Sequence, residues 1–197
     1  MREISKLVLV LSLICGISAT ALTIVRISLE ERIDMQNDFY VRGPALEQLF
    51  KKPANDLLKD KIVFTMDDIA YPIFYMTKGN EITGLAIEAP GHGGYGGDVI
   101  IMIGIDTEAE KIIGLEIIQH SETPGVGSNI EKVSFRKQWN NLLINELVEL
   151  RARGGTIDAI SGATYSSNAV VDGTNKVKII INEHLDEIEA LIQVNLN

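Results

Sequence analysis

The hydrophobic pattern of the chain starts with one long apolar run and then changes to short ones. Residues 7–25 read LVLVLSLICGISATALTIV without a charge. As a helix this run is about 28 Å long, close to the thickness of the bilayer core. The pattern therefore predicts an N-terminal transmembrane anchor over residues 1–27. A cleaved signal peptide is the alternative, because residues 18–21 (SATA) resemble a cleavage site, although the apolar part of a signal peptide is usually shorter.

The charges around the apolar run indicate its orientation. Arg2 and Lys6 precede it, whereas Arg26 is followed by the acidic Glu30 and Glu31. The positive-inside rule then favours a cytoplasmic N-terminus. We expect a single-pass protein of the cytoplasmic (inner) membrane, in contact with its lipid, whose domain faces the extracytoplasmic side. Cys15 lacks the small residues that precede a lipid-modified cysteine, so we expect no lipid anchor.

Short apolar runs rich in Ile and Val begin at Lys61. They are KIVFTM, PIFYMTKG, EITGLAIEA, DVIIMIGID and KIIGLEIIQH, and Gly, Pro and Asn punctuate them. Such runs are typical of strands, and the absence of helix-sized segments between most of them predicts a mainly antiparallel sheet. Helical spacing of apolar residues predicts packing helices over residues 130–150 and 167–194.

The predicted class is thus α+β, a mainly antiparallel sheet with packing helices plus one N-terminal transmembrane helix. Residues 28–60 form a lead-in helical segment, since Ala45, Leu46, Leu49 and Phe50 have helical spacing before Pro53. Residues 61–197 form one domain. The sequence shows no internal repeat and no low-complexity linker that would separate a second one.

Composition and charge narrow the chemistry. The chain has 197 residues, of which 46% are hydrophobic and 23% charged, as in ordinary globular proteins. A net charge of -9 without a cluster of Lys and Arg argues against nucleic acid as a partner. With one Cys, iron–sulfur clusters, c-type haem and an internal disulfide are excluded. The 3 His lack metal-site spacing, so we expect no metal unless distant segments assemble one.

Residues 158–167 (DAISGATYSS) have the properties of a phosphate site. They combine small residues with hydroxyls and lead directly into the predicted C-terminal helix. Free N–H groups in the first turn of a helix favour an anion by about 0.3–1 kcal/mol. An ordinary Ser/Thr-rich helix cap explains the same residues, and the spacing alone does not decide between the two.

Two more polar segments follow strand-like runs. Residues 90–98 (PGHGGYGGD) are rich in glycine, so the backbone can approach a ring or a phosphate, and a flexible hairpin loop is the alternative. Residues 120–127 (HSETPGVG) place His120 and Glu122 beside glycines, where they are either ligand contacts or solvated turn residues.

The DAISGAT segment resembles the flavinylation motif of the FMN-binding domain family, in which a flavin transferase esterifies the FMN phosphate to the last Thr or Ser. The resemblance implies that FMN is bound covalently to Thr164 through a phosphoester. Asp158, Ser161, Gly162 and Ala163 are the other matching motif residues, which position the acceptor or are read by the transferase. Such a bond leaves the flavin ring unmodified, so the surroundings of the ring set its potential.

The order GYGG, HSETPGVG, SGAT is similar to that of the G subunits of Rnf ion-translocating electron transport complexes. The likeness extends over the N-terminal helix and nearly the whole domain. It implies a flavin pocket with Glu122, Thr123, Tyr95 and Gly96, and we add Ser167 to the cofactor-binding residues. The related C subunits of the sodium-pumping NADH:quinone oxidoreductase share these motifs but are usually longer, and they are the second possibility.

The resemblance implies an electron-carrier subunit of an ion-translocating ferredoxin:NAD oxidoreductase, not a complete enzyme. Its partners are the other membrane and peripheral subunits, and the flavin transferase during maturation. No catalytic residue is expected, since no G-x-G-x-x-G follows a predicted strand and opens a helix, and the sequence has neither a G-x-S-x-G elbow nor a Cys nucleophile beside a His. A membrane-anchored flavin sensor and a purely structural anchor subunit are the alternatives from other classes.

Overall fold

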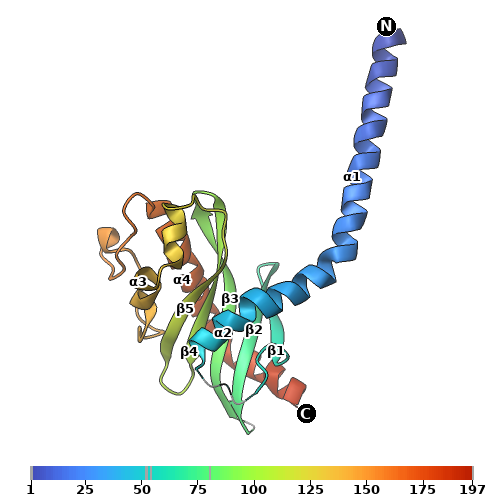
Figure 1. Cartoon of the computed structure of the whole chain (residues 1–197). Helices are drawn as coiled ribbons and strands as arrows, with labels where there is room; N and C mark the ends of the chain where they lie inside the picture. Colours follow the sequence, from blue (N-terminus) through green and yellow to red (C-terminus); the bar gives the residue numbers. More distant parts are fainter. Residues whose placement is uncertain (1, 52, 54, 80, 197) are drawn as a thin grey trace. The chain divides into compact units, whose positions relative to one another are not determined.

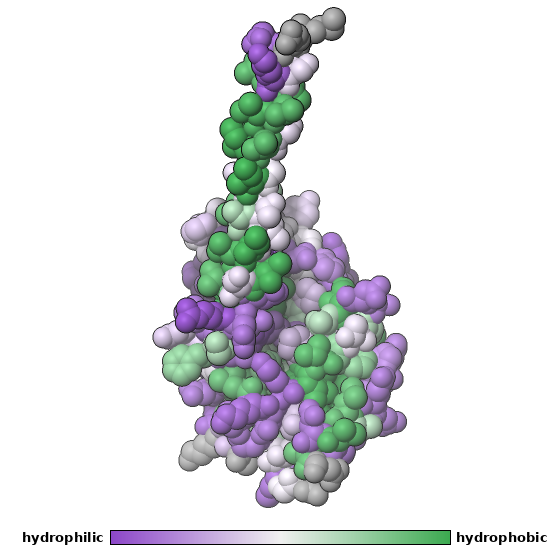
Figure 2. All heavy atoms as spheres, turned by 90° about the vertical axis from the view of Figure 1, so that its right-hand side faces the viewer, coloured by the Kyte–Doolittle hydropathy of each residue, from purple (hydrophilic) through white to green (hydrophobic). Residues whose placement is uncertain are grey.

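The computed structural model describes residues 2–51, 53, 55–79 and 81–196. The chain divides into two compact units, one up to Tyr40 and one from Val41 on. The first unit is the helix α1 (Arg2–Asn37), followed by the π-helical turn η1 (Asp38–Arg42) that joins the units. Apolar side chains gather on α1 below its polar N-terminal end (Figure 2), and the helix is long and apolar enough to cross a membrane. The predicted candidate span is therefore present, and the helix continues ten residues beyond residue 27.

The second unit is built on a five-stranded antiparallel sheet whose strands follow one another in sequence order (Figure 1). The strands are β1 (Lys61–Met66), β2 (Ile69–Lys78), β3 (Glu81–Gly94), β4 (Gly97–Asp106) and β5 (Lys111–Gln119). Each overlaps one of the five predicted runs, so the predicted mainly antiparallel sheet is confirmed. The glycine-rich segment is a tight turn rather than a flexible loop, because β3 and β4 continue to Gly94 and Gly97 and leave only Tyr95 and Gly96 between them.

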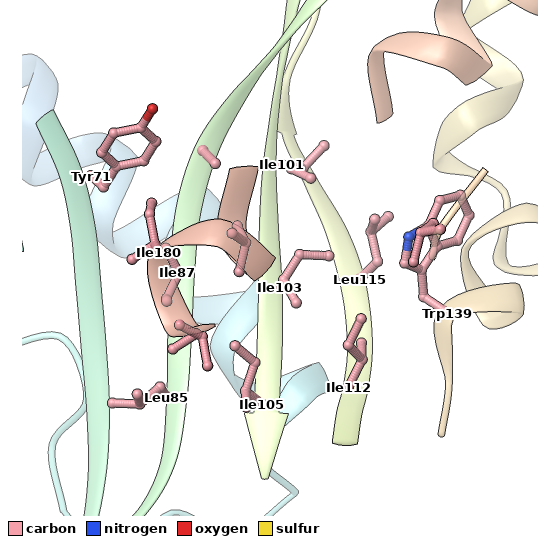
Figure 3. Packing of buried hydrophobic residues seen from close by; sticks show 14 of the residues in the cluster. Tyr71, Leu85, Ile87, Ile101, Ile103, Ile105, Ile112, Leu115, Trp139 and Ile180 are labelled. Atoms are coloured by element: carbon pink, nitrogen blue, oxygen red, sulfur yellow. The ribbon is translucent and has the colours of Figure 1, made fainter. Parts of the chain in front are cut away.

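The long helix α4 (Thr164–Leu196) covers one face of this sheet and confirms the predicted C-terminal helix. Isoleucines and leucines of the strands point into the layer between sheet and helix, where Ile180 of α4 joins them (Figure 3). Trp139 closes this layer beside Leu115, and its indole Nε1 donates to Thr174 Oγ1 of α4 at 2.8 Å. Burial of this apolar layer is the main force that holds α4 in place.

The short helix α2 (Gly43–Leu49), which lies in the predicted lead-in helical segment, covers part of the other face. Its Leu49 lies against Gly104 of β4 and Gly114 of β5, where a Cβ atom would come within 3.2 Å of the leucine side chain. Glycine at both positions lets the helix approach the sheet closely. A bidentate ion pair of Arg42 with Glu88 of β3, with Nε–Oε2 and Nη2–Oε1 distances of 2.6 and 2.9 Å, fixes the start of α2.

The predicted helix over residues 130–150 is wrong. Only short pieces form there: η2 (Gly127–Glu131), α3 (Val133–Arg136) and η3 (Lys137–Trp139), with η4 (Arg151–Arg153) further on. Asn141 has φ +65°, and Ile112 N–H donates to Leu142 O at 2.9 Å. The segment after Trp139 therefore bonds to β5, and its apolar residues reach the core from a backbone of turns and isolated bridges.

Candidate functional site

Three of the predicted segments meet at one end of the sheet, where a cavity of about 230 Å³ opens beside the start of α4. Its lining comes from the β3–β4 turn, the segment after β5 and the residues around the predicted acceptor. The lining residues are Tyr95, Glu122, Thr123, Val126, Gly127, Gly162, Ala163, Tyr165 and Ser166. The cavity is smaller than the roughly 300–1,000 Å³ of enclosed ligand sites. A ring bound here would therefore keep part of its edge exposed.

Thr164 is the first residue of α4 and is exposed. Its neighbours Ala163 and Tyr165 both line the cavity. The amide N–H groups of Thr164, Tyr165 and Ser166 donate no hydrogen bond within the described part of the chain. These amides lie at the positive end of a long helix dipole, so they fit a phosphate group attached at this position.

We call residues 158–164 the acceptor loop. Gly162 has φ +78°, a conformation that favours glycine, and the turn it forms is closed by the hydrogen bond from Ala163 N–H to Ile160 O at 2.9 Å. Ser167 is fully buried, and its Oγ accepts from Ile160 N–H at 3.0 Å and donates to Ala163 O at 3.0 Å. Ser167 thus supports the acceptor loop from inside the domain. Ser161 is exposed and does not line the cavity.

Asp158 begins the acceptor loop and is exposed. Its carboxylate accepts two hydrogen bonds from Arg151, from Nε to Oδ1 at 2.6 Å and from Nη2 to Oδ2 at 3.2 Å. The hydrogen bond and the positive charge of Arg151 lower the pKa of Asp158 below its usual value of 3.8. Asp158 does not line the cavity, so its carboxylate belongs to the acceptor loop and not to the cavity wall.

The cavity contains a buried carboxylate. Glu122 accepts from Ser166 Oγ at 2.6 Å on Oε2 and from Gly96 N–H at 3.2 Å on Oε1. Glu122 and Ser166 are 5% and 1% exposed. A Cβ atom on Gly127 would lie 2.4 Å from Glu122 Oε2, so the wall leaves no space behind the carboxylate. We call Glu122, Ser166, Gly96 and Gly127 the carboxylate cluster.

His120 holds the backbone of the carboxylate cluster. Its Nδ1 accepts from Glu122 N–H at 3.0 Å, and its Nε2 lies 3.0 Å from Glu131 Oε1. An Nδ1 that accepts leaves the proton on Nε2 in the neutral ring, so Nε2 donates to Glu131; this assignment follows from the hydrogen-bond geometry. His120 therefore lies behind the cavity and fixes Glu122 without lining the cavity itself.

The structure thus brings Tyr95, Glu122, Thr123, Gly162 and Ala163 together around one cavity. Gly96 takes part through its N–H, whereas Asp158, Ser161 and Ser167 lie outside the lining. Sequence reasoning missed Val126, Gly127, Tyr165 and Ser166. Tyr165 is 68% exposed, and the signal available in the sequence was an aromatic residue directly after the predicted acceptor.

Among the described residues, no group of His, Cys, Asp or Glu could hold a metal ion. An apolar and aromatic lining beside hydroxyls, free helix amides and one carboxylate suits a planar ring that carries a phosphate. The residues present therefore fit FMN.

The sequence matches known proteins along most of its length. The model of the FMN-binding domain matches residues 94–178. The G subunit of the ion-translocating oxidoreductase complex of Vibrio vulnificus (strain YJ016) is 32% identical over 156 residues, which cover 73% of each chain. The corresponding protein of Aliivibrio fischeri (strain ATCC 700601 / ES114) is 29% identical over 208 residues, covering 97% of this chain and 96% of the relative.

Solved structures are also similar. The C subunit of the Na⁺-translocating NADH-quinone reductase from Parabacteroides distasonis has 21% identity and a TM-score of 0.48, covering 65% of this chain and 67% of that one. The level of identity and coverage shared with the Vibrio vulnificus protein shows the family. The chain belongs to the G subunits of ion-translocating oxidoreductase complexes, and it contains an FMN-binding domain.

Proposed function

We propose that this chain is the membrane-anchored, FMN-carrying electron-transfer subunit of an Rnf-type ion-translocating ferredoxin:NAD oxidoreductase, with FMN joined to Thr164 Oγ by a phosphodiester. The observation that carries the proposal is the exposed Thr164, which begins α4 beside the cavity with free amides around it. Membership of the G-subunit family supports the redox role. FMN supplies one- and two-electron chemistry when it is bound.

In this proposal each segment of the site has its own task. The amides of the first turn of α4 hold the phosphate, and Gly162 and Ala163 let the chain approach it. Tyr95, Thr123 and Tyr165 border the ring, while Glu122 and Gly96 provide a fixed polar wall. Asp158, Ser161 and Ser167 act through the acceptor loop rather than on the ring. Because the cavity is open, electrons can reach the ring edge from a partner subunit.

The remaining parts of the proposal concern the membrane. Residues 1–27 anchor the chain in the inner membrane and its lipid, residues 28–60 lead into the domain, and residues 61–197 carry the flavin on the extracytoplasmic side. Charges before and after the apolar run support this orientation. Protease added to the outside of spheroplasts should then cleave the domain, and protection until the membrane is opened would contradict the orientation.

The attachment is tested by mass. The full chain is co-expressed with a flavin transferase, denatured and run on a gel, where covalent flavin fluoresces under ultraviolet light. Trypsin cuts after Arg153 and Lys176, so residues 154–176 form one peptide. We expect this peptide to carry the mass of FMN less one water, with fragmentation placing it on Thr164.

The peptide contains its own control. Thr156 is exposed and lies in the same peptide, so Thr156→Val should keep the flavin while Thr164→Val loses it. Flavin on another hydroxyl, or flavin that remains after Thr164→Val, would refute the acceptor assignment. A chain that never carries covalent flavin would support a structural subunit instead.

A further inference from the structure

Two residues outside the DAISGAT segment hold Asp158, one through its backbone and one through its side chain. Gln138 bonds to its backbone in both directions: its Oε1 accepts from Asp158 N–H at 2.7 Å, and its Nε2 donates to Asp158 O at 3.2 Å. Arg151 occupies both oxygens of the side chain. Gln138 directly precedes Trp139, which is packed into the core, so the first residue of the acceptor loop is tied to the domain interior.

Arg151 is fixed as well. Its N–H donates to Ile157 O at 2.7 Å, and its Nη2 also donates to Thr156 O at 3.3 Å. Residues 151–158 thus form a closed turn around the guanidinium. The acceptor loop is held at its start by Gln138 and Arg151 and near its end by Ser167, and Thr164 stands just beyond the turn at Gly162.

We propose that Gln138 and Arg151 are positioning residues for flavin attachment: they hold the acceptor loop in the shape in which the transferase receives Thr164. This inference rests on the proposed function and deepens it. Both residues lie outside the segment that resembles the flavinylation motif, so the transferase substrate includes more than that segment. The rival explanation is that the transferase reads the Asp158 carboxylate directly, in which case Arg151 would compete with it.

The geometry favours positioning for two reasons. Gln138 bonds only to the backbone of Asp158. A transferase that recognised the Asp158 carboxylate directly would not need these bonds. Both carboxylate oxygens are already bonded to Arg151. The ion pair is exposed, so it contributes little to global stability, and its removal should leave the domain folded.

The attachment reaction shows why position matters. Ester formation from free FMN would have to expel water, so the donor is a flavin dinucleotide. The Thr164 Oγ–P bond forms as the pyrophosphate bond breaks, AMP leaves with the electron pair, and a base of the transferase takes the hydroxyl proton. In the described part of the chain no side chain is bonded to the Thr164 hydroxyl, so the chain contributes alignment only. A displacement of about 1 Å can cost up to 100-fold in rate.

The test uses the full-length chain in detergent, purified without flavin, with purified transferase and FAD. Initial rates of covalent fluorescence give kcat and KM for the chain as substrate. We expect Gln138→Ala and Arg151→Ala each to lower kcat/KM about 10-fold, mainly through kcat, as for a misaligned reactant. Arg151→Lys should recover part of the loss, since a lysine can pair with Asp158 at one point only.

Arg153→Ala is the matched control. Arg153 is an exposed arginine in the same η4 turn, and it donates no side-chain hydrogen bond in the described part of the chain. It should leave kcat/KM unchanged. Hydrogen exchange of the flavin-free chain provides the second measurement: the amides of Ile160 and Ala163, which donate hydrogen bonds that hold the acceptor loop, should exchange faster in Gln138→Ala and Arg151→Ala, at an unchanged melting temperature.

The outcomes are distinct. Equal kcat/KM for Gln138→Ala and the wild type, or a rate that rises in Arg151→Ala while Asp158→Asn abolishes transfer, would overturn the positioning role and support direct reading. Unchanged exchange in the acceptor loop would overturn it too. A wild-type chain that accepts no flavin would refute the proposed function, and this inference with it.

Discussion

The acceptor loop ends at Thr164, and the carboxylate cluster includes Ser166 two residues later, yet the two are built in opposite ways. Most of the acceptor loop is exposed, and the hydrogen bonds that hold its first residue, Asp158, are exposed to water. In the carboxylate cluster the side chains of Glu122 and Ser166 are buried, and Glu122 is bonded to Ser166 and to the Gly96 amide in a wall without free space. A segment that another enzyme modifies has to be reachable, whereas a group that sets the surroundings of a ring has to be dry and fixed.

The largest expected effect comes from a substitution in the exposed acceptor loop, which leaves the carboxylate cluster intact. Thr164→Val should abolish covalent flavin, because it removes the only oxygen of that side chain. Stability should change by less than about 0.5 kcal/mol, as for most surface substitutions. In-gel fluorescence and urea unfolding measure the two quantities. Thr164→Ser should keep the flavin, and a destabilised Thr164→Val chain would show that the acceptor is part of the core.

A substitution in the carboxylate cluster should instead lower the stability of the domain. Ser166→Ala removes the hydroxyl that donates to Glu122 Oε2 and leaves a buried carboxylate oxygen without this donor. Hydrogen bonds to charged groups contribute about 1.5–3 kcal/mol, so we expect a loss of about 2 kcal/mol in the free energy of unfolding. Urea unfolding of the flavin-free chain checks this. Ser161→Ala in the exposed loop is the control and should cost less than about 0.5 kcal/mol.

A smaller effect concerns the flavin potential. A negative charge beside the ring opposes the uptake of electrons, so Glu122→Gln should raise the midpoint potential. An interaction change of about 1.4 kcal/mol corresponds to about 30 mV for a two-electron couple. Spectroelectrochemical titration of the loaded chain measures it. Glu131→Gln removes an exposed carboxylate from the same chain of hydrogen bonds and should shift the potential much less, since water screens it. Equal shifts of the midpoint potential in the two variants would mean that burial of the carboxylate does not determine its effect on the flavin.

The smallest effect is a pH dependence of the acceptor loop. The hydrogen bond from Arg151 lowers the pKa of Asp158 from 3.8, so the bonded form persists at every pH above that value. The stabilisation is lost only as the pH falls through the lowered folded-state pKa. Exchange of the loop amides, corrected for intrinsic rates, should therefore be constant from pH 7 to about pH 4. A rise already near pH 5 would indicate that the ion pair does not form in solution.

The sequence predicted the sheet well because each strand carries its own signal. Runs such as residues 98–106 are apolar, short and bounded by turn residues, and they need no knowledge of a partner. The prediction of a helix after Trp139 was wrong for the opposite reason. Leu142 and Ile144 belong to a set of apolar residues with roughly helical spacing, but their backbone bonds to β5 and to the turn before it, and periodicity contains no information about such a competing partner.

The residues of the candidate site likewise divide into those that the sequence predicted and those that it did not. Thr164 and Glu122 lie in segments that composition and family resemblance single out. The roles of Ser166 and Ser167 depend on direction, since adjacent residues of a helix point about 100° apart. One hydroxyl therefore meets Glu122, and the next meets the acceptor loop. Val126 and Tyr165 line the cavity only because three distant segments meet, which no single segment reveals.

The start of α4 is coupled to the packing of the whole helix. Ala169, Val170, Thr174 and Val177 of the same helix are fully or almost fully buried. One residue inserted between Thr164 and Ala169 would either rotate the acceptor by about 100° relative to the cavity or rotate the buried face out of the core. Natural variation and protein engineering can therefore relocate the predicted acceptor along this helix only in steps close to whole turns.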